Sequence, residues 1–366
     1  LYAAALAAEI FRLEPGAVIS GFGGERLRAS GATLVRDFRG LSVTGLTEAL
    51  GVIPRSWSAY RAIVQAADAA PPDVFVPIDF PDFNVFLARA LHRRGVPIVY
   101  YISPQLWAWR RGRLRTIKRI ADRVLVIFPF EEAFYREAGV PATFVGHPLL
   151  ELSAPAEPRG AFLHAHGLDP AKPVVAILPG SRRNELRAIL PGLVESAGLI
   201  AIRLPDAQFV IARAPHLDDE LFAPLANWPA AARQPVVVEN AADAVLGAAD
   251  VALLASGTVT IQAALHGCPM VVVYRLGPLT YRIGKPFVHV DTYAMVNLVA
   301  GRPVVPELIQ DDFTPEAAAA EALRVLTDAA YAARIRADLA DVRAKLGSAG
   351  ASRRAAEAIL GVIREP

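Results

Sequence analysis

The chain has 366 residues, of which 54% are hydrophobic, and its 38 basic and 36 acidic residues give a net charge of +2. This length is enough for two domains of roughly 150 residues each. The balanced charge argues against binding nucleic acid over a large surface, so any basic contact surface must be local. No stretch offers about 18 apolar residues without a charge, Pro or Gly, so a membrane-spanning helix is not expected.

Short apolar runs alternate with longer amphipathic stretches along the chain, which is the pattern of βαβ units and parallel sheets. The opening "LYAAALAAEIF" lacks the basic n-region of a signal peptide and predicts a helix already in progress. The expected strands are "PDVFVPIDF", "VPIVYYI", "DRVLVIF" and "ATFVGH" in the first half, and "PVVAILPGS", "AQFVIARAP", "PVVVEN", "DVALLAS" and "PMVVVYR" in the second. From about Thr314 the chain is Ala-rich with Leu and Ile at helical spacing, which predicts helices to near its end.

A stretch rich in Pro and Ala separates the two halves. This stretch, "PLLELSAPAEPRGAF", shows no periodicity and predicts an interdomain linker. We therefore predict an α/β protein with two Rossmann-like, doubly wound parallel-sheet domains facing a central cleft. The first spans residues 1–150 and the second 151–340, and a helix at 341–366 should pack back on the first. Ligands of such domains bind at the carboxyl ends of the strands.

Two residues receive an ordinary interpretation. Cys268 is the only cysteine, which excludes an intrachain disulfide and favours a reducing compartment. A small buried residue entering a strand is its expected role, with a catalytic thiol as the less favoured alternative. His147 in "FVGHPLLE" follows a strand, where it either contacts a ligand or satisfies a backbone carbonyl. We favour the second role.

The stretch "IDFPDFN" carries Asp79, Asp82 and Asn84 at the end of an apolar strand. A carboxylate in this position is a candidate general base. Asp and Asn also cap helices and form turns because they satisfy free backbone donors. The residues alone leave both roles open.

The stretch from 102 to 131 places Trp107 and Trp109 beside six basic residues and contains no acid before Asp122. The basic residues are Arg110, Arg111, Arg113, Arg115, Lys118 and Arg119. Nucleic acid, a membrane surface or a phosphorylated small molecule would each suit such a stretch. An ordinary solvated helix is the fourth interpretation.

Two turns in the second half have the form of anion sites. In "AILPGSRRNEL" a strand leads through Pro-Gly-Ser to a helix that begins with Arg182 and Arg183. Backbone N–H groups at a helix N-terminus favour an anion, and an arginine can bind phosphate with two hydrogen bonds. In "LLASGTVTIQ", Ser256, Gly257 and Thr258 repeat the arrangement. Two such turns suit a diphosphate, although each could simply cap its helix.

Other cofactor motifs are missing from the sequence. Neither turn matches the ATP-binding G-x-x-x-x-G-K-[ST] pattern, and no G-x-G-x-x-G follows a strand. The glycines of "GFGGERL" have a different spacing, so NAD is not favoured. The acids form no D-x-D pair and the histidines have no zinc spacing, so we expect a reaction without metal or cofactor.

These stretches, in this order, resemble the lipid-A-disaccharide synthases, which are glycosyltransferases of the GT-B fold. The resemblance runs from near residue 21 to near residue 310, and the combination of "SPQLWAWR", "FPFE" and "FVGHPL" is its most specific part. The matching stretches are "GFGGERLRASG", "IDFPDFN", "YISPQLWAWRRGR", "LVIFPFEEAFYREAGVPATFVGHPLLE", "LPGSRRNEL", "LLASGTVTIQAAL", "CPMVVVYR" and "NLVAGRPVVPELIQ".

The resemblance implies an inverting transfer that releases UDP. UDP-2,3-diacylglucosamine would donate its sugar to 2,3-diacylglucosamine 1-phosphate to form the β(1→6) lipid A disaccharide. Asp82 would accept the proton of the acceptor's 6-hydroxyl, and Arg182 would neutralise charge on the departing UDP. The residues expected to bind substrate or UDP are Asn84, Ser181, Ser256, Gly257, Thr258, Gln262, Tyr274, Arg275 and Asn297.

The resemblance also gives the basic stretch a role. Both substrates carry long acyl chains, so a cytoplasmic enzyme of a Gram-negative bacterium would work at the inner face of the cytoplasmic membrane without crossing it. Trp107, Trp109, Arg110 and Arg111 would contact that surface, because aromatic rings settle at headgroup depth and arginines are attracted to anionic lipids. The family also allows a homodimer.

The sequence departs from the family at three places. Gln262 stands where the family has Glu, and an amide accepts ribose hydrogen bonds more weakly than a carboxylate, which predicts weakened UDP affinity. The family has a strand and a "G-E-x-S-G-D" loop just before the position of Leu1, so the first domain is expected to lack both. Val296 stands where the family tends to have Pro, which should alter only a local turn.

Two alternatives remain open from the sequence. The chain could be another UDP-N-acetylglucosamine-type GT-B enzyme, such as a murein transferase or a 2-epimerase. It could also be a non-catalytic, membrane-associated binding protein that descended from the transferase. Retention of "PDFN" and "PGSR" argues against the second.

Overall fold

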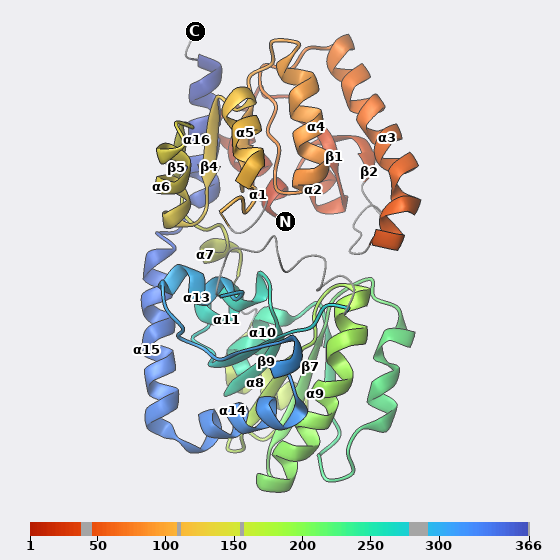
Figure 1. Cartoon of the computed structure of the whole chain (residues 1–366), viewed down its shortest axis with the longest axis vertical. Coiled ribbons are helices and arrows are strands. Elements are labelled where there is room, and N and C mark those ends of the chain that lie inside the picture. The colour runs from red at the N-terminus through yellow and green to blue at the C-terminus, as the bar shows by residue number, and fades with distance from the viewer. Residues whose placement is uncertain (38–45, 108–110, 154–156, 278–291, 365–366) are drawn as a thin grey trace. The chain divides into compact units, whose positions relative to one another are not determined.

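The structure is a computed structural model that describes residues 1–37, 46–107, 111–153, 157–277 and 292–364 (Figure 1). The chain divides into two compact units. The first contains Leu1–Glu151 and Leu346–Pro366, and the second begins at Leu152 and continues to Lys345. Among the described helices, none is long and apolar enough to cross a membrane.

The first unit contains a three-stranded parallel sheet and a separate parallel pair of strands. The sheet has the order β3-β4-β5 and the pair is β1-β2. The strands are β1 (Ser20–Gly23), β2 (Thr33–Asp37), β3 (Val99–Tyr101), β4 (Arg123–Val126) and β5 (Ala142–Phe144). The helices are α1 (Tyr2–Leu13), α2 (Glu25–Ala29), α3 (Leu46–Ala69), α4 (Pro81–His92), α5 (Leu114–Ile120), α6 (Pro129–Glu137) and α16 (Ala351–Arg364), with a short 3₁₀ helix at Arg111–Arg113.

The predicted strand "PDVFVPIDF" is wrong as a regular strand. Phe75 and Ile78 form isolated parallel bridges to Ile98 and Tyr101. Pro77 lies between them and has no N–H to donate, so a continuous ladder cannot form there. The carbonyl of Pro77 still accepts a hydrogen bond from the Tyr101 N–H at 2.9 Å. The segment therefore runs beside β3 and delivers the following Asp79 to the end of the sheet.

The C-terminal helix α16 belongs to the first unit, where it packs against α1. Glu151 accepts the backbone N–H groups of Gly350 at 2.7 Å and Ser352 at 3.1 Å, and so caps the start of this helix. Arg364, in its last turn, pairs with Glu14 at 3.0 Å. These contacts tie the chain's last helix to its first.

The second unit is built on a six-stranded, wholly parallel sheet with the order β11-β10-β9-β6-β7-β8. Its strands are β6 (Val174–Leu178), β7 (Gln208–Arg213), β8 (Val236–Glu239), β9 (Val251–Ala255), β10 (Met270–Tyr274) and β11 (Glu307–Ile309). All residues of β6 and β9 are buried, which explains why both read as continuous apolar runs. The strands predicted for this half are confirmed, and β11 was not predicted.

Helices follow the strands of this sheet, and α9 and α14 pack against each other (Figure 1). Thr314 begins α14 by accepting the Ala317 N–H at 3.1 Å, so the predicted start of the helical tail is confirmed.

The prediction of an irregular linker at "PLLELSAPAEPRGAF" is wrong in part, because α7 and α8 occupy both ends of that stretch. Helix α7 (Leu149–Leu152) lies at the boundary between the units. The helices of the second unit are α8 (Arg159–Ala165), α9 (Arg183–Arg203), α10 (Ala242–Ala248), α11 (Val259–Leu265), α13 (Met295–Ala300), α14 (Pro315–Thr327) and α15 (Ala329–Lys345), with 3₁₀ helices at Asp219–Asn227 and Gln310–Asp312.

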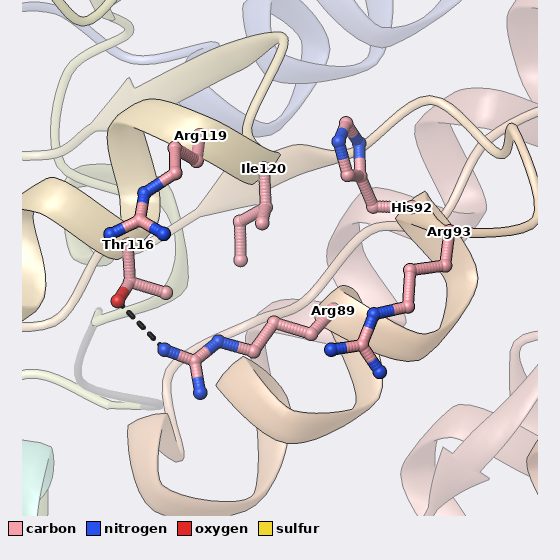
Figure 2. Close-up of a pocket in the computed structure, with 6 residues that line it drawn as sticks. All are labelled: Arg89, His92, Arg93, Thr116, Arg119 and Ile120. Carbon is pink, nitrogen blue, oxygen red and sulfur yellow. Dashed lines mark hydrogen bonds between the residues drawn. The ribbon is translucent and has the colours of Figure 1, made fainter.

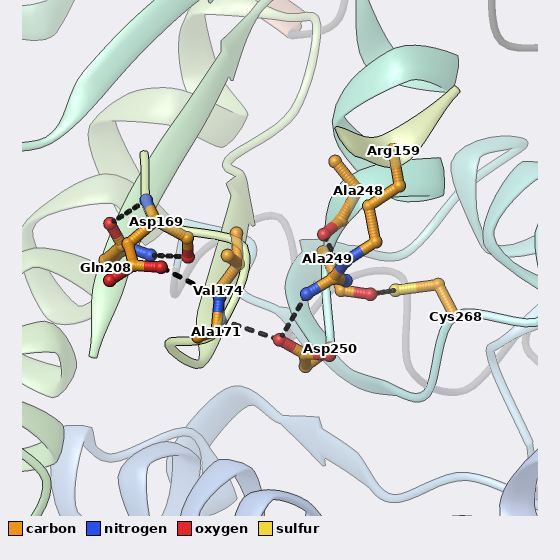
Figure 3. Close-up of polar contacts among 9 residues, drawn as sticks. All are labelled: Arg159, Asp169, Ala171, Val174, Gln208, Ala248, Ala249, Asp250 and Cys268. Atoms are coloured by element: carbon orange, nitrogen blue, oxygen red, sulfur yellow. Dashed lines mark hydrogen bonds and ion pairs between the residues drawn. The ribbon is translucent and has the colours of Figure 1, made fainter. Parts of the chain in front are cut away.

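Polar groups hold together the amino-terminal edge of the second sheet (Figure 3). Asp250, just before β9, accepts the Val174 N–H at 2.8 Å and an Arg159 N–H at 3.1 Å. Gln208, at the start of β7, exchanges two hydrogen bonds of 2.8 Å with the backbone of Asp169. These groups are used in folding, which leaves the opposite, carboxyl edge for ligands.

Cys268 lies in the same network at the start of β10. Its Sγ is 3.5 Å from the Pro269 carbonyl oxygen and 4.0 Å from that of Ala249. Burial raises the pKa of the thiol to about 12, so it stays protonated near neutral pH. The structure gives this cysteine the packing role expected from the sequence.

Candidate active site

The strand order of the second unit defines where a ligand binds. Strand β6 leads to β7 and β8 on one side, and β9, β10 and β11 lie on its other side. The carboxyl ends of β6 and β9 therefore flank the point where the strand order reverses, which is the ligand position in doubly wound sheets. Both predicted anion turns, Pro179–Arg182 and Ser256–Thr258, begin at this point.

The turn after β6 is shaped around Glu185. Gly180 has a φ of +118°, and a Cβ there would lie 2.7 Å from Glu185 Oε2, so only glycine fits. Glu185 accepts the Ser181 N–H at 3.2 Å and an Arg182 N–H at 2.8 Å. Glu185 thus fixes the conformation of the turn through these two hydrogen bonds, and 55% of the Arg182 side chain remains exposed. Arg183 pairs with Asp218 instead.

Tyr274 ends β10 near the Arg182–Glu185 pair. Burial raises the pKa of its phenol, the Glu185 carboxylate raises it further, and Arg182 opposes both. The phenol is therefore neutral and shares the electrostatic surroundings of the β6 turn. Arg275 is engaged differently, since it donates to the carbonyls of Gln310 at 3.3 Å and of Phe313 and lies over the Phe313 ring at 4.9 Å. The structure gives Arg275 a part in anchoring the chain after β11.

The turn after β9 is open. A Cβ placed on Gly257 would meet no atom within 4 Å, and Thr258 is exposed at the start of α11. Ser256 is held in place, because its N–H donates to the Val273 carbonyl at 3.0 Å and its hydroxyl to that of Tyr293 at 3.1 Å. The turn is positioned by its neighbours and leaves space above its backbone.

Gln262, on α11, takes part in a polar cluster with Asp243. Its amide N–H donates to Asp243 Oδ1 at 3.1 Å, and the same oxygen lies 2.9 Å from His266 Nε2 and accepts the Ser153 hydroxyl. Burial alone would raise the pKa of Asp243, but the hydrogen bonds from His266, Ser153 and Gln262 outweigh it and hold the pKa below its usual value. The cluster was not expected from the sequence, since its members are far apart along the chain.

Asn297 differs from its expected position facing a ligand. It is only 2% exposed, and its amide N–H groups donate to the Val305 carbonyl at 2.9 Å and to Glu307 at 2.6 Å. Its Oδ1 accepts the N–H groups of Val304 at 2.8 Å and Val305 at 3.0 Å. With every donor and acceptor used, Asn297 holds the segment that leads into β11.

In the first unit, Asp82 lies in the first turn of α4, directly after a turn of unusual backbone. Asp79 and Phe80 both have positive φ, 47° and 44°, and α4 begins directly after them. Asn84 donates to the carbonyls of Ile78 at 3.1 Å and Asp79 at 2.7 Å, and the Tyr100 hydroxyl donates to that of Asp79 at 3.2 Å. Such strain persists only where surrounding contacts enforce it.

The Asp82 side chain is 59% exposed and forms an ion pair with Arg113. The Asp82 carboxylate is therefore accessible to solvent, and the backbone that leads to it is constrained by hydrogen bonds. Asn84 was expected to position this aspartate, and it holds the backbone of the turn that carries it.

The structure contradicts one of the four residues predicted to contact a membrane and does not describe the side chains of the other three. Trp107 is only 8% exposed and its indole N–H donates to the buried Glu131 at 3.1 Å, so the prediction of a surface position is wrong for this residue. Trp109 and Arg110 lie outside the described residues, as does the side chain of Arg111. Exposed aromatic residues that the sequence analysis missed are Trp57, 60% exposed and stacked on Tyr60 at 5.1 Å, and Phe86, 61% exposed.

His147 is buried and burial lowers its pKa to about 4, so it is neutral. Its Nδ1 accepts the Leu149 N–H at 3.1 Å. The expected structural role fits, although the partner is a backbone donor in place of the expected carbonyl.

Comparisons with known proteins agree along the whole chain. The family model described as lipid-A-disaccharide synthetase matches residues 1–362. A lipid-A-disaccharide synthase of Geobacter sulfurreducens is 44% identical over 366 residues, which cover 99% of this chain and 94% of the relative. One from Myxococcus xanthus is 43% identical, again over 99% of this chain and 94% of the relative.

Solved structures support the fold. A UDP-GlcNAc 2-epimerase from Neisseria meningitidis bound to UDP-GlcNAc has a TM-score of 0.65 at 12% identity, covering 94% of this chain and 99% of the other. The glycosyltransferase of kitacinnamycin has a TM-score of 0.64 at 20% identity, covering 98% and 94%. The predicted GT-B fold is confirmed. With a family match over nearly its full length, the chain belongs to the lipid-A-disaccharide synthase family of glycosyltransferases.

Proposed function

We propose that the chain transfers the sugar of UDP-2,3-diacylglucosamine to 2,3-diacylglucosamine 1-phosphate with inversion. The acceptor's 6-oxygen forms a bond to the donor's anomeric carbon as the bond from that carbon to the UDP oxygen breaks. The hydroxyl proton passes to Asp82, and the electron pair of the broken bond leaves with UDP. The observation that carries the assignment of Asp82 is its exposed carboxylate on the constrained Asp79–Phe80 turn.

The second unit supplies groups for UDP. Arg182 and the N–H groups that begin α9 favour the diphosphate, and they act more strongly as its charge grows during departure. The Ser181 hydroxyl adds a donor from the first turn, and Gly257 and Thr258 add donors from the second turn. Ser256 holds that second turn in place through its own hydrogen bonds. Tyr274 borders the uridine pocket, and Gln262 accepts from the ribose through its amide oxygen. Arg275 and Asn297 do not contact UDP directly, because their polar groups are hydrogen-bonded within the second unit.

We also propose that the protein works at the inner face of the cytoplasmic membrane without crossing it. Acylated sugars are held there by burial of their chains, worth about 0.8 kcal/mol for each CH₂. The exposed Trp57 and Phe86 support this, since aromatic rings settle at headgroup depth. Trp109, Arg110 and Arg111 remain proposed contacts on the basis of the sequence.

The test is UDP release from UDP-2,3-diacylglucosamine in neutral detergent micelles, with and without 2,3-diacylglucosamine 1-phosphate. Release should require the acceptor, and Asp82→Asn should lower kcat about a thousandfold without changing UDP affinity. Asp73→Asn is the matched control, because Asp73 is an exposed carboxylate of the same unit. Arg182→Gln should lower kcat about a hundredfold, and Arg187→Gln, an exposed arginine of the helix that follows, is its control. An Asp82→Asn enzyme as fast as the parent would refute the mechanism.

A further inference from the structure

The first unit contains a cavity of about 350 Å³ between α4 and α5 that has no part in the proposed transfer. It is lined by Arg89, His92, Arg93, Thr116, Arg119 and Ile120 (Figure 2). The arginines come from two helices, and Ile120 supplies an apolar wall. This volume is at the lower end of the range for small-ligand sites, roughly 300 to 1,000 Å³.

The cavity concentrates positive charge that the described structure does not neutralise. Three arginines line it and no acid does, in a chain whose net charge is only +2. Within the described ranges, no carboxylate forms an ion pair with Arg89, Arg93 or Arg119. The neighbouring acids are used elsewhere, since Asp68 pairs with Arg94 at 2.6 Å and Asp122 accepts the Ile98 N–H at 2.7 Å.

The polar groups are arranged as a cradle for an anion. Arg89 is half-buried and donates to the Thr116 hydroxyl at 2.8 Å, which fixes its guanidinium on the α5 side of the cavity (Figure 2). Arg119 is exposed and, among the residues that the structure describes, donates to the Arg115 carbonyl alone, at 3.3 Å, which leaves its other N–H groups for a ligand. Arginine forks bind the oxygens of phosphate with paired hydrogen bonds, and the Thr116 hydroxyl adds one more polar group.

A competing explanation is the position of these residues at helix ends. Arg89 and His92 lie in the last turn of α4 and Arg119 in the last turn of α5, where cations are favoured by the helix dipole. That effect accounts for basic residues on each helix separately. The helix dipole does not explain why the C-terminal ends of α4 and α5 line the same cavity. It also does not explain why Arg89 of α4 is hydrogen-bonded there to Thr116 of α5. It also predicts that an anion would have no specific effect, which an experiment can check.

We propose that the α4–α5 cavity binds a phosphate ester anion. Two sources share this chemistry, a phospholipid headgroup and a soluble phosphate. The site is separate from the transfer reaction, because Asp82 and Arg113 lie at the other ends of these two helices. From Asp82 to Arg89 is seven residues, or about 10 Å along a helix.

The first arm measures thermal unfolding in inorganic phosphate at constant ionic strength, with UDP in excess so that the sites of the second unit are filled. The midpoint of the wild-type protein should rise with phosphate. In Arg89→Gln/Arg119→Gln the apparent Kd for phosphate should rise at least about tenfold, since each arginine supplies charge-assisted hydrogen bonds. Arg94→Gln/Arg115→Gln removes the same charge outside the cavity and should keep the shift.

The second arm measures cosedimentation with phosphatidylcholine vesicles that contain one quarter phosphatidylglycerol. If the source is a headgroup, the cavity double variant should bind at least about tenfold less than the charge-matched control. Vesicles of phosphatidylcholine alone show how much binding is independent of anionic headgroups. A specific loss in either arm supports the site. A loss in the vesicle arm assigns the site to a headgroup, and a loss with inorganic phosphate but not with vesicles assigns it to a soluble phosphate.

An equal effect of the two double variants in both arms would overturn the proposal, because it would mean a diffuse charge effect. The transfer assay in neutral micelles keeps this result apart from the proposed function. The cavity double variant should retain the parent's kcat and its KM for the acceptor. A raised acceptor KM would assign the cavity to the acceptor's own phosphate and would also overturn the proposal of a separate site.

Discussion

The two units position their candidate site residues by different means. In the second unit a long parallel sheet ends in two turns, and backbone geometry with one glycine and one glutamate places the donors. In the first unit the strands are short and the segment before α4 forms only isolated bridges. Side chains bonded to backbone carbonyls hold the turn that carries Asp82.

This difference has consequences for mutation and for recognition from sequence. A site built on backbone geometry tolerates most side-chain changes but is disrupted where the backbone itself is changed. A site held by side chains is weakened by each lost bond, in proportion to the energy of that bond. The following variants test this comparison, beginning with the largest expected effect.

Gly180→Ala should produce the largest loss. The alanine would have to adopt a φ of +118°, and its Cβ would lie 2.7 Å from Glu185 Oε2 and 2.9 Å from Glu185 Cβ, so the turn after β6 must move. Backbone strain and overpacking together should lower the free energy of unfolding by about 4 kcal/mol. Urea unfolding measures this loss, and calorimetry with UDP should show weakened binding. Gly257→Ala is the control for stability, because a Cβ there meets no atom within 4 Å. UDP binding is compared with the wild-type protein alone, since Gly257 belongs to the proposed diphosphate site. Equal losses in the two variants would contradict a turn built around Gly180.

Glu131 should make the stability of the first unit depend on pH. Burial raises the pKa of this carboxyl to about 7, against hydrogen bonds from Trp107 and Phe128 that favour its charged form. The folded protein therefore holds a proton that the unfolded chain releases above about pH 4.5. Glu131 by itself should therefore lower the stability by about 3 kcal/mol as the pH rises from 5 to 8. Buried His147 acts in the opposite direction over this range, because its lowered pKa means that the unfolded chain binds a proton that the folded protein does not.

The measurement is urea unfolding at several pH values, comparing the wild-type protein with Glu131→Gln. Glutamine cannot titrate at position 131, and the effect of His147 is common to both proteins. The stability of the wild-type protein relative to the variant should therefore fall by about 3 kcal/mol over this range. Parallel curves for the two proteins would show that another group is responsible.

Asn84→Ala tests the side-chain contacts that hold the Asp82 turn. The variant loses two hydrogen bonds, to the carbonyls of Ile78 and Asp79, and should lose about 2 kcal/mol of stability. Because Asp82 would be less well fixed, kcat should fall about tenfold while UDP affinity stays unchanged. Asn84→Asp sharpens the test, since a carboxylate cannot donate to these carbonyls and should not restore activity. Full activity of either variant would show that the turn does not need this support.

The sequence predicted the second unit better than the first for a physical reason. The fully buried strands β6 and β9 are continuous apolar runs, and the turns of Gly and Ser that follow them are local signals. The short strands β1 and β2 lie in segments without such a run, and Pro77 interrupts the ladder before Asp79.

Side-chain partners far apart in the sequence could not be predicted. Trp107 lies among arginines and was taken for an interfacial residue, yet its partner is Glu131, beyond the next strand. Asn297 matched a family position near the ligand, and its burial depends on the fold of residues 304–307. The cavity between α4 and α5 likewise needs two helices whose arginines are separated by a strand.

Gln262→Glu should have the smallest effect, and it tests whether the polar cluster of the second unit constrains this position. The sequence predicts that a glutamate would strengthen UDP binding by accepting ribose hydrogen bonds with a charge. The structure predicts an opposing effect on stability. The Gln262 nitrogen is 3.1 Å from Asp243 Oδ1, so a glutamate at position 262 would place its carboxylate against that of Asp243, and the two would repel each other. We expect a loss of about 1 kcal/mol of stability in the unliganded variant, measured by urea unfolding. Gln262→Glu/Asp243→Asn should recover it, because the amide can donate to the new carboxylate. If the single variant is as stable as the wild-type protein, Asp243 does not restrict residue 262. The effect of Gln262→Glu on UDP affinity would then depend on the ribose hydrogen bonds alone.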